Sequence, residues 1–151
     1  ATQAFHSQSM SPKQSLGEPP PDAYFRPDGG VCGIVMGFRN GITVYDTSDT
    51  AVFSDMQLIG QMYGPQIAIF PVGGKFTMGK FTMGIREAAR AASFVRPDIV
   101  IPCHYGEAVG QPADINKLSE AISFLSPGTK LVRLDPGQSV TYETSRYTVD
   151  G

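Results

Sequence analysis

Apolar residues fall into short runs separated by turn residues, and this spacing predicts alternating strands and helices. Two β-rich runs at residues 31–38 and 42–46 flank Asn40-Gly41, and an Asn-Gly pair between such runs is a strong hairpin signal. Apolar positions then recur at helical spacing over residues 52–63, until Gly64-Pro65. We therefore expect a hairpin followed by a helix.

The chain is organised around residues 66–106. An apolar run at 67–72 stops at Gly73-Gly74, an Ala-rich helical pattern follows as far as Pro97, and a second apolar run leads to His104. This order of strand, loop, helix and strand predicts a βαβ unit. Functional groups in such folds gather at the carboxyl ends of strands, which makes His104 a candidate.

The remaining pattern completes an α/β fold class. Residues 1–30 are rich in Ser, Pro, Gln and Gly and predict an extended or loop segment. Residues 113–125 read as a helix with Asp114 near its start, and residues 131–134 and 139–143 read as short strands. We expect residues 31–151 to form a mixed β-sheet with about three helices on one face.

A five-residue repeat interrupts the βαβ unit. The letters KFTMG occur at residues 75–79 and again at 80–84, which is too short for a repeat architecture and indicates a tandem duplication. Either copy can begin the helix, so we expect a longer and more mobile connection between Val72 and Ile85.

Composition excludes several classes of function. The chain has 151 residues, is 41% hydrophobic and carries a net charge of −2, which suits one globular domain and gives no basic field for nucleic acid. No apolar run approaches the roughly 20 residues of a membrane helix, and no signal pattern opens the chain. The two cysteines, Cys32 and Cys103, lie in apolar segments. We expect both to be free, buried thiols in a cytoplasmic protein.

Three residues are candidate metal ligands. His6 and His104 are the two histidines of the chain, and Asp49 follows a predicted strand as His104 does. Imidazole and carboxylate groups at neighbouring strand ends are what a metal site on an α/β scaffold requires. Their spacing is not diagnostic, so a solvated or structural role for each stays open.

Ordered motifs give a more specific signal. Most of the chain resembles the C-terminal half of metal-dependent hydrolases of the metallo-β-lactamase superfamily, in its largely uncharacterised bacterial and archaeal branch. The matching motifs are Ala4-Phe5-His6-Ser7, Ser48-Asp49-Thr50, Phe53-Ser54-Asp55-Met56, Pro71-Val72-Gly73-Gly74, Phe81-Thr82-Met83-Gly84, Glu87-Ala88-Ala89 and Ile101-Pro102-Cys103-His104-Tyr105. The family form has a single FTMG, and it has Gly where Ser48 stands and His or a small residue where Asp46 stands.

The resemblance implies half of an αββα sandwich with a one- or two-metal centre at the rim of its sheets. His6 would complete a first metal site, Asp49 would bridge both metals, and His104 would complete the second. Zinc is the expected divalent metal, with manganese or iron as alternatives. A bound water with a pKa of about 7 would attack an ester, amide or phosphoester.

One family motif is absent from the chain, and its absence shapes the functional hypotheses. HxHxDH, which supplies most ligands of the first site, does not occur, and the sequence begins at Ala1. The first hypothesis is therefore a hydrolase fragment, inactive alone, with no catalytic residue of its own assigned. Its uncovered sheet face would pair with the missing N-terminal half or with a second copy in a homodimer. The alternatives are a non-catalytic binding or assembly module and, less specifically, a phosphate site at Gly73-Gly74. The substrate is not revealed.

Overall fold

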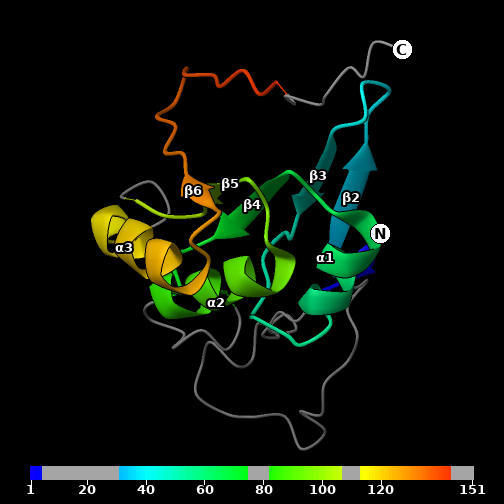
Figure 1. Ribbon diagram of the computed structural model, residues 1–151. Helices are drawn as coiled ribbons and strands as arrows, with labels where there is room; N and C mark the ends of the chain where they lie inside the picture. The colour runs from blue at the N-terminus through cyan, green and yellow to red at the C-terminus, as the bar shows by residue number, and fades with distance from the viewer. Residues whose placement is uncertain (5–30, 75–81, 107–112, 144–151) are drawn as a thin grey trace, which may run out of the picture.

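The computed structural model describes residues 1–4, 31–74, 82–106 and 113–143, which form one sheet with helices packed on it (Figure 1). Helices and strands alternate along most of this chain. The elements are β1 (Thr2–Gln3), β2 (Cys32–Gly37), β3 (Thr43–Asp46), α1 (Met56–Tyr63), β4 (Ile67–Pro71), α2 (Ile85–Val95), β5 (Ile99–Cys103), α3 (Ile115–Leu125) and β6 (Lys130–Leu131).

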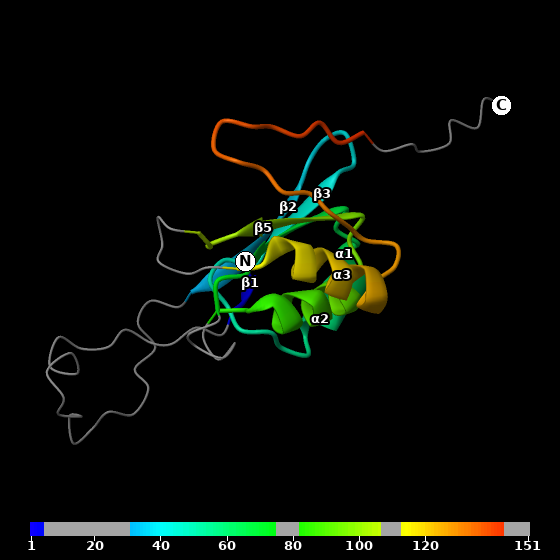
Figure 2. The ribbon, with the colours of Figure 1, turned by 90° about the vertical axis from the view of Figure 1, so that its left-hand side faces the viewer.

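The strand order explains why the helices share one face. The six strands lie in the order β1-β2-β3-β4-β5-β6, with antiparallel pairing up to β3 and parallel pairing from β3 to β6. Each parallel step goes in the same direction across the sheet, and right-handed crossovers then place α1, α2 and α3 on the same side. Figure 2 shows all three below the strands. No helix in the described ranges is long and apolar enough to cross a membrane.

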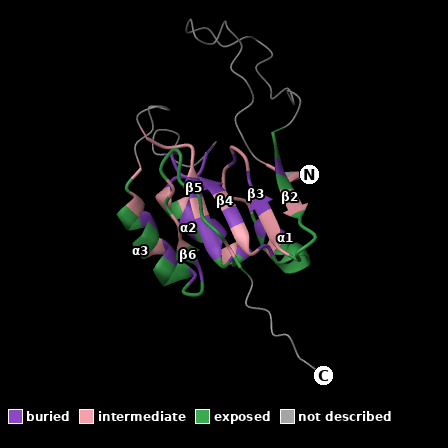
Figure 3. Cartoon of the chain, turned by 90° about the horizontal axis from the view of Figure 1, so that it is seen from above, coloured by how far each residue is buried: buried purple, intermediate pink, exposed green. Residues whose placement is uncertain are grey.

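The hydrophobic core fills the space between the sheet and these helices. Tyr45, Ala68, Phe70 and Val100 point from β3, β4 and β5 into this core and have no exposed surface. Alanines of α2 meet them, because a small side chain lets a helix lie close to the sheet. Figure 3 shows the burial concentrated along the central strands, with exposed residues at both edges.

The opposite face of the sheet is also apolar. Side chains alternate between faces along a strand, so the residues between the core positions, among them Ile67, Ile69 and Ile101, point away from the helices. Continuous apolar runs of this kind are typical of strands covered on both faces. Here Ile34 of β2 remains 49% exposed. In Figure 2, the segment after β6 crosses above this side of the sheet.

That segment is tied to the sheet by one side-chain contact. The hydroxyl of Tyr142 donates a hydrogen bond to the carboxylate of Asp98, just before β5. Burial and this bond to Asp98 raise the pKa of Tyr142 to about 12. The phenol therefore keeps its proton, and its bond, throughout the neutral range.

Local sequence signals are confirmed at several element ends. Gly41 closes the β2–β3 hairpin at φ 83°, and Asn40 accepts a hydrogen bond from the Ile42 amide at 3.2 Å. Gly64 ends α1 in the left-handed conformation at φ 50°, as a glycine does most readily. The side chain of Asp114 caps α3 by accepting from the Lys117 amide at 3.1 Å.

Some of the predicted elements are wrong. The first helix begins at Met56 and not at residue 52, because the chain before it packs as a loop whose side chains Val52 and Phe53 lie against the core. The predicted strand at residues 131–134 is reduced to β6, and residues 139–143 form no strand. An unpredicted strand, β1, pairs with β2. Cys32 is a free thiol as expected but is exposed at the start of β2, whereas Cys103 is half-buried.

The duplicated segment precedes α2. This helix begins at Ile85, after both copies, so the connection from β4 is long, as predicted. In the second copy, the amide of Gly84 donates to the carboxylate of Glu87 at 3.2 Å, which caps the helix. The first copy, residues 75–79, lies outside the described residues, and so does the expected mobility of the connection.

A close approach of α1 to α2 gives a first prediction. A Cβ at Gly60 would lie 2.7 Å from the Val95 carbonyl oxygen and 2.8 Å from the Val95 Cα. Gly60→Ala therefore forces two helices apart, and we expect it to lower the free energy of unfolding by about 1–3 kcal/mol. Helix propensity alone predicts a gain of about 1 kcal/mol. Urea denaturation followed by circular dichroism distinguishes the steric loss from the gain in helix propensity. An increase in stability would contradict the close contact of α1 with α2.

Candidate metal centre

The carboxyl ends of three neighbouring parallel strands meet at one edge of the sheet. β3 runs into the loop Thr47-Ser48-Asp49-Thr50, and β5 runs into His104. β4 lies between these two strands. Directly after it, the amide of Val72 donates a hydrogen bond to the carbonyl of Cys103 in β5, at 3.0 Å. The topology thus brings together Asp49 and His104, which are 55 residues apart in the numbering of the chain.

The distance between these two side chains is informative. Nε2 of His104 lies 3.6 Å from Oδ2 of Asp49, and the two side chains are 30% and 41% exposed. This separation is too long for a hydrogen bond. Two donor atoms that each lie about 2.0–2.1 Å from one zinc ion can be at most about 4.2 Å apart, so the pair can hold a single ion between them.

The other imidazole nitrogen of His104 does not face Asp49. Nδ1 of His104 is buried and has no hydrogen-bond partner among the described residues. A buried polar atom without a partner is rare and calls for an explanation. His104 also has a left-handed backbone, at φ 53°, and unfavourable backbone conformations in non-glycine residues are concentrated at functional sites. The geometry and the donor set fit a divalent cation.

The Asp49 loop is anchored to the neighbouring strand. Thr47 is fully buried, and both its amide and its hydroxyl donate to the Ile69 carbonyl of β4, at 3.2 Å and 3.0 Å. The carboxylate of Asp46 accepts from the Ser48 amide at 2.9 Å. Ser48 itself has φ 57°. The chain therefore reaches Asp49 through Thr47, which is anchored to β4, and through a turn at Ser48.

A second set of backbone contacts holds the other side of this loop. The amide of Met83 donates to the Thr50 carbonyl at 3.0 Å, and the amide of Gly74 donates to the Met83 carbonyl at 2.9 Å. Thr50 and Met83 are fully buried. Met83, from the second KFTMG copy, thus helps to hold the loop that carries Asp49. The amide of Gly74 already donates to Met83, and Gly74 is buried. Both observations disfavour a phosphate site at Gly73-Gly74.

Cys103 lies beside the site but does not contribute a thiolate. Burial, followed by the negative charges of Asp46 and Asp49, raises the pKa of the Cys103 thiol to about 12. A thiol binds metals and acts as a nucleophile in its deprotonated form. At neutral pH, Cys103 in the chain as it stands is therefore a protonated, apolar packing residue.

The third predicted ligand, His6, lies outside the described residues. β1 runs parallel to β3, since both are antiparallel to β2, so Gln3 ends at the same edge of the sheet as Asp49. Within the described ranges, no group of three or more His, Cys, Asp or Glu side chains is placed to hold a metal ion. The described part of the centre is the pair Asp49 and His104.

Sequence reasoning missed the residues that fix the Asp49 loop. The sequence predicts a polar loop over residues 46–50 after a strand, but it assigns Asp46, Thr47 and Ser48 no part in holding Asp49. The run Asp-Thr-Ser-Asp-Thr directly after a strand carries the relevant signal, because short polar side chains bond to nearby backbone groups and stabilise tight turns.

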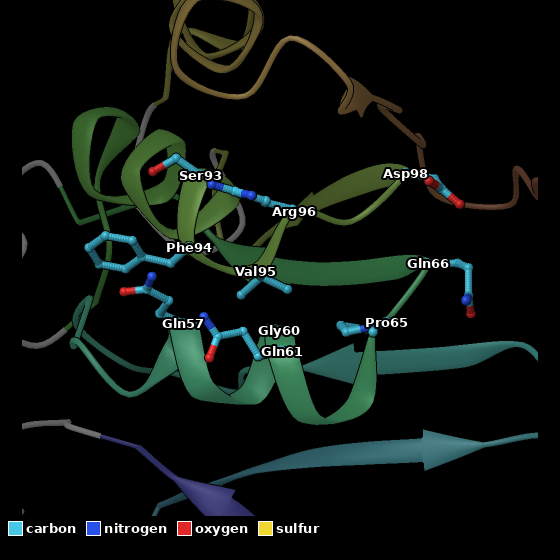
Figure 4. Close-up of a pocket in the computed structure, with 11 residues that line it drawn as sticks. Gln57, Gly60, Gln61, Pro65, Gln66, Ser93, Phe94, Val95, Arg96 and Asp98 are labelled. Atoms are coloured by element: carbon cyan, nitrogen blue, oxygen red, sulfur yellow. The ribbon is translucent and has the colours of Figure 1, made fainter.

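A cavity of about 350 Å³ lies at the opposite edge of the sheet. Its lining comes from one side of α1, from the carboxyl end of α2 and from the residues that precede β4 and β5, including Gln57, Gln66, Arg96 and Asp98 (Figure 4). The amino ends of parallel strands lie far from their carboxyl ends, so this cavity is separate from Asp49 and His104.

Comparison with known proteins identifies relatives of the chain. A UPF0173 metal-dependent hydrolase of Staphylothermus marinus is 40% identical over 114 residues, 76% of this chain and 47% of the relative. One from Methanosarcina mazei is 41% identical over 117 residues, 75% of this chain and 46% of the relative. No protein-family model matches the chain. It spans about half the length of the curated relatives that it matches.

Solved structures agree with the fold. The metallo hydrolase Igni18 of Ignicoccus hospitalis superposes with a TM-score of 0.65 at 34% identity, over 78% of this chain and 48% of that one. The structure of a "putative Zn-dependent hydrolase of the metallo-beta-lactamase superfamily" from Thermotoga maritima superposes with a TM-score of 0.52 at 20% identity, over 73% of this chain and 60% of that one. At this lower identity, the likeness supports the fold alone.

Proposed function

We propose that the chain is the C-terminal half of a UPF0173-type metal-dependent hydrolase with the metallo-β-lactamase fold, and that Asp49 and His104 hold a divalent cation for hydrolysis. The observation that carries this proposal is the 3.6 Å separation of the Asp49 carboxylate and the His104 imidazole. This spacing suits two ligands of one ion better than a hydrogen-bonded pair. Zinc suits these donors, and manganese or iron are the alternatives.

When bound, a zinc-type cation lowers the pKa of a coordinated water to about 7 and so supplies a nucleophile for an ester, amide or phosphoester. The other residues of this chain would hold the two ligands, Asp49 and His104, in position. Thr47 and the contact of Met83 with Thr50 hold the Asp49 loop. The turn at the end of β5 places the imidazole of His104 3.6 Å from the Asp49 carboxylate.

The complete active site needs a second half. The chain contains no HxHxDH motif, and it matches about half of each relative. An apolar sheet face with half-buried Ile67, Ile69 and Ile101 and an exposed Ile34 requires a cover. We propose that an N-terminal half covers this face and supplies the remaining ligands, and that the chain alone is catalytically inactive. A second copy in a homodimer is the alternative cover.

Metal binding by the purified chain tests the proposal directly. Equilibrium dialysis against Zn²⁺ should show saturable binding, and Asp49→Ala and His104→Ala should each weaken it at least about tenfold, since each removes one of few ligands. Glu120→Ala, which removes an exposed carboxylate on α3 far from the site, should leave the affinity unchanged.

Two outcomes would contradict the metal centre. Equal zinc affinity in all four proteins would place the metal elsewhere. No binding of zinc, manganese or iron by the unmodified chain would favour the second hypothesis, a non-catalytic module that retains the fold. Hydrolysis of generic esters or phosphodiesters by the chain alone would contradict the proposed need for another half.

A further inference from the structure

The residue before Asp49 has an unusual backbone conformation. Ser48 has φ 57°, and the other described non-glycine residues with positive φ are Arg96 and His104. Two of these three positions therefore belong to the candidate metal centre. A left-handed conformation is unfavourable for a residue with a Cβ unless nearby groups stabilise it.

In the described structure, two side chains contact the backbone of Ser48: the Thr47 hydroxyl lies 3.3 Å from its carbonyl oxygen, and the carboxylate of Asp46 holds its amide more closely. Oδ1 of Asp46 accepts a hydrogen bond from the Ser48 amide at 2.9 Å. A bond from a side chain to the amide two residues further on closes an Asx turn, which holds the backbone in a tight bend. A charged acceptor makes this bond stronger than one between neutral groups.

This bond fixes the peptide between Thr47 and Ser48, from which the chain turns toward Asp49. Thr47 is anchored to β4 through the Ile69 carbonyl, and Thr50 is anchored through its carbonyl to the Met83 amide. Both threonines are fully buried. Only Ser48 and Asp49 lie between them, so a change in the φ angle of Ser48 would redirect the Asp49 carboxylate.

We propose that Asp46 is a positioning residue that aims Asp49 at the metal centre by holding Ser48 in the left-handed conformation. The role of Asp49 as a ligand rests on the proposed function above, whereas the conformational role of Asp46 does not. The inference also explains how a non-glycine residue is accommodated at position 48. Glycine adopts a positive φ without a penalty and needs no brace, whereas Ser48 does need one, and Asp46 provides it.

The test compares Asp46 variants in two backgrounds, Ser48 and Ser48→Gly. Asp46→Ala removes the acceptor, and Asp46→Asn keeps an acceptor oxygen without the charge. The first readout is the intraresidue NOE between the amide proton and Hα of residue 48, which is strong at positive φ. The second is the affinity of the whole chain for Co²⁺, followed by visible absorption.

We expect Asp46→Ala to weaken the Ser48 NOE and to lower the Co²⁺ affinity roughly tenfold, the ratio expected for loss of one hydrogen bond to a charged group. In the Ser48→Gly background, the same substitution should change the affinity by less than about twofold, since glycine keeps the turn unaided. Asp46→Asn should retain the NOE and most of the affinity.

Each contrary outcome has a definite meaning. An unchanged Ser48 NOE in Asp46→Ala would overturn the brace, whatever happens to the metal. An equal loss of Co²⁺ affinity in both backgrounds would also overturn it, because Asp46 would then act on the metal directly. If the unmodified chain binds no Co²⁺, the proposed function fails, and the NOE still decides whether Asp46 holds the turn.

Discussion

Gly74→Ala is expected to lower the free energy of unfolding by at least about 3 kcal/mol, a large share of the 5–15 kcal/mol that stabilises a typical domain. A Cβ at this position would lie 1.9 Å from the Thr82 carbonyl oxygen and 2.6 Å from the Met83 carbonyl carbon. Both are backbone atoms, which cannot turn aside as the end of a side chain can. The loop after β4 and the segment before α2 would have to separate.

The damage should extend to the metal centre. Separating these segments breaks the bond of Gly74 to Met83 and moves the Met83 amide away from Thr50, which it holds at 3.0 Å. The Asp49 loop then loses one of its two anchors. We therefore expect Gly74→Ala to weaken zinc binding under conditions in which the chain remains folded.

Gly37→Ala is the matched control. This glycine ends β2, and a Cβ there meets nothing within 4 Å. The substitution should be neutral or stabilise the chain by up to about 1 kcal/mol through the unfolded state. Urea denaturation of both variants provides the measurement. Equal stability of Gly74→Ala and Gly37→Ala would show that residues 82–83 do not pack against Gly74.

Signals that act over a few residues predicted much of the fold. The Asn40-Gly41 turn, the Gly64 cap and the Asp114 cap depend on the backbone preferences of single residues, and each lies where it was predicted. The hydrophobic runs at β4 and β5 are continuous because strands covered on both faces carry apolar side chains on both. These features need no knowledge of distant parts of the chain.

Strands at the edges of the sheet escaped prediction for the opposite reason. Residues 139–143 have the composition of a strand, yet a strand exists only where a neighbour offers a free edge, and these residues pair with none in the described structure. Thr2 and Gln3 carry no strand signal of their own and form β1 because the edge of β2 accepts them. Such pairing depends on the whole sheet.

The sequence predicted that Asp49 and His104 lie at the same edge of the sheet, but it did not predict which residues hold their loops. Asp49 and His104 each follow a predicted strand, so the rule for carboxyl ends places both at one edge. The geometry of their loops depends on contacts across 22 residues, from Thr47 to the Ile69 carbonyl, and across 33, from Thr50 to Met83. Hydrophobic periodicity does not encode bonds of this kind, and only the fold reveals them.

Phe70→Ala should produce the other large effect, a loss of about 3–5 kcal/mol in the free energy of unfolding. Phe70 lies at the middle of the core on β4, has no exposed surface and packs where the sheet meets the helices. Phe124→Ala on α3 removes the same side chain from a position that is 84% exposed, and should change stability by less than about 0.5 kcal/mol. Comparable losses in the two variants, measured by urea denaturation, would mean that the outer face of α3 is buried in solution. A small loss at Phe70 would contradict its position in the core between β4 and the helices.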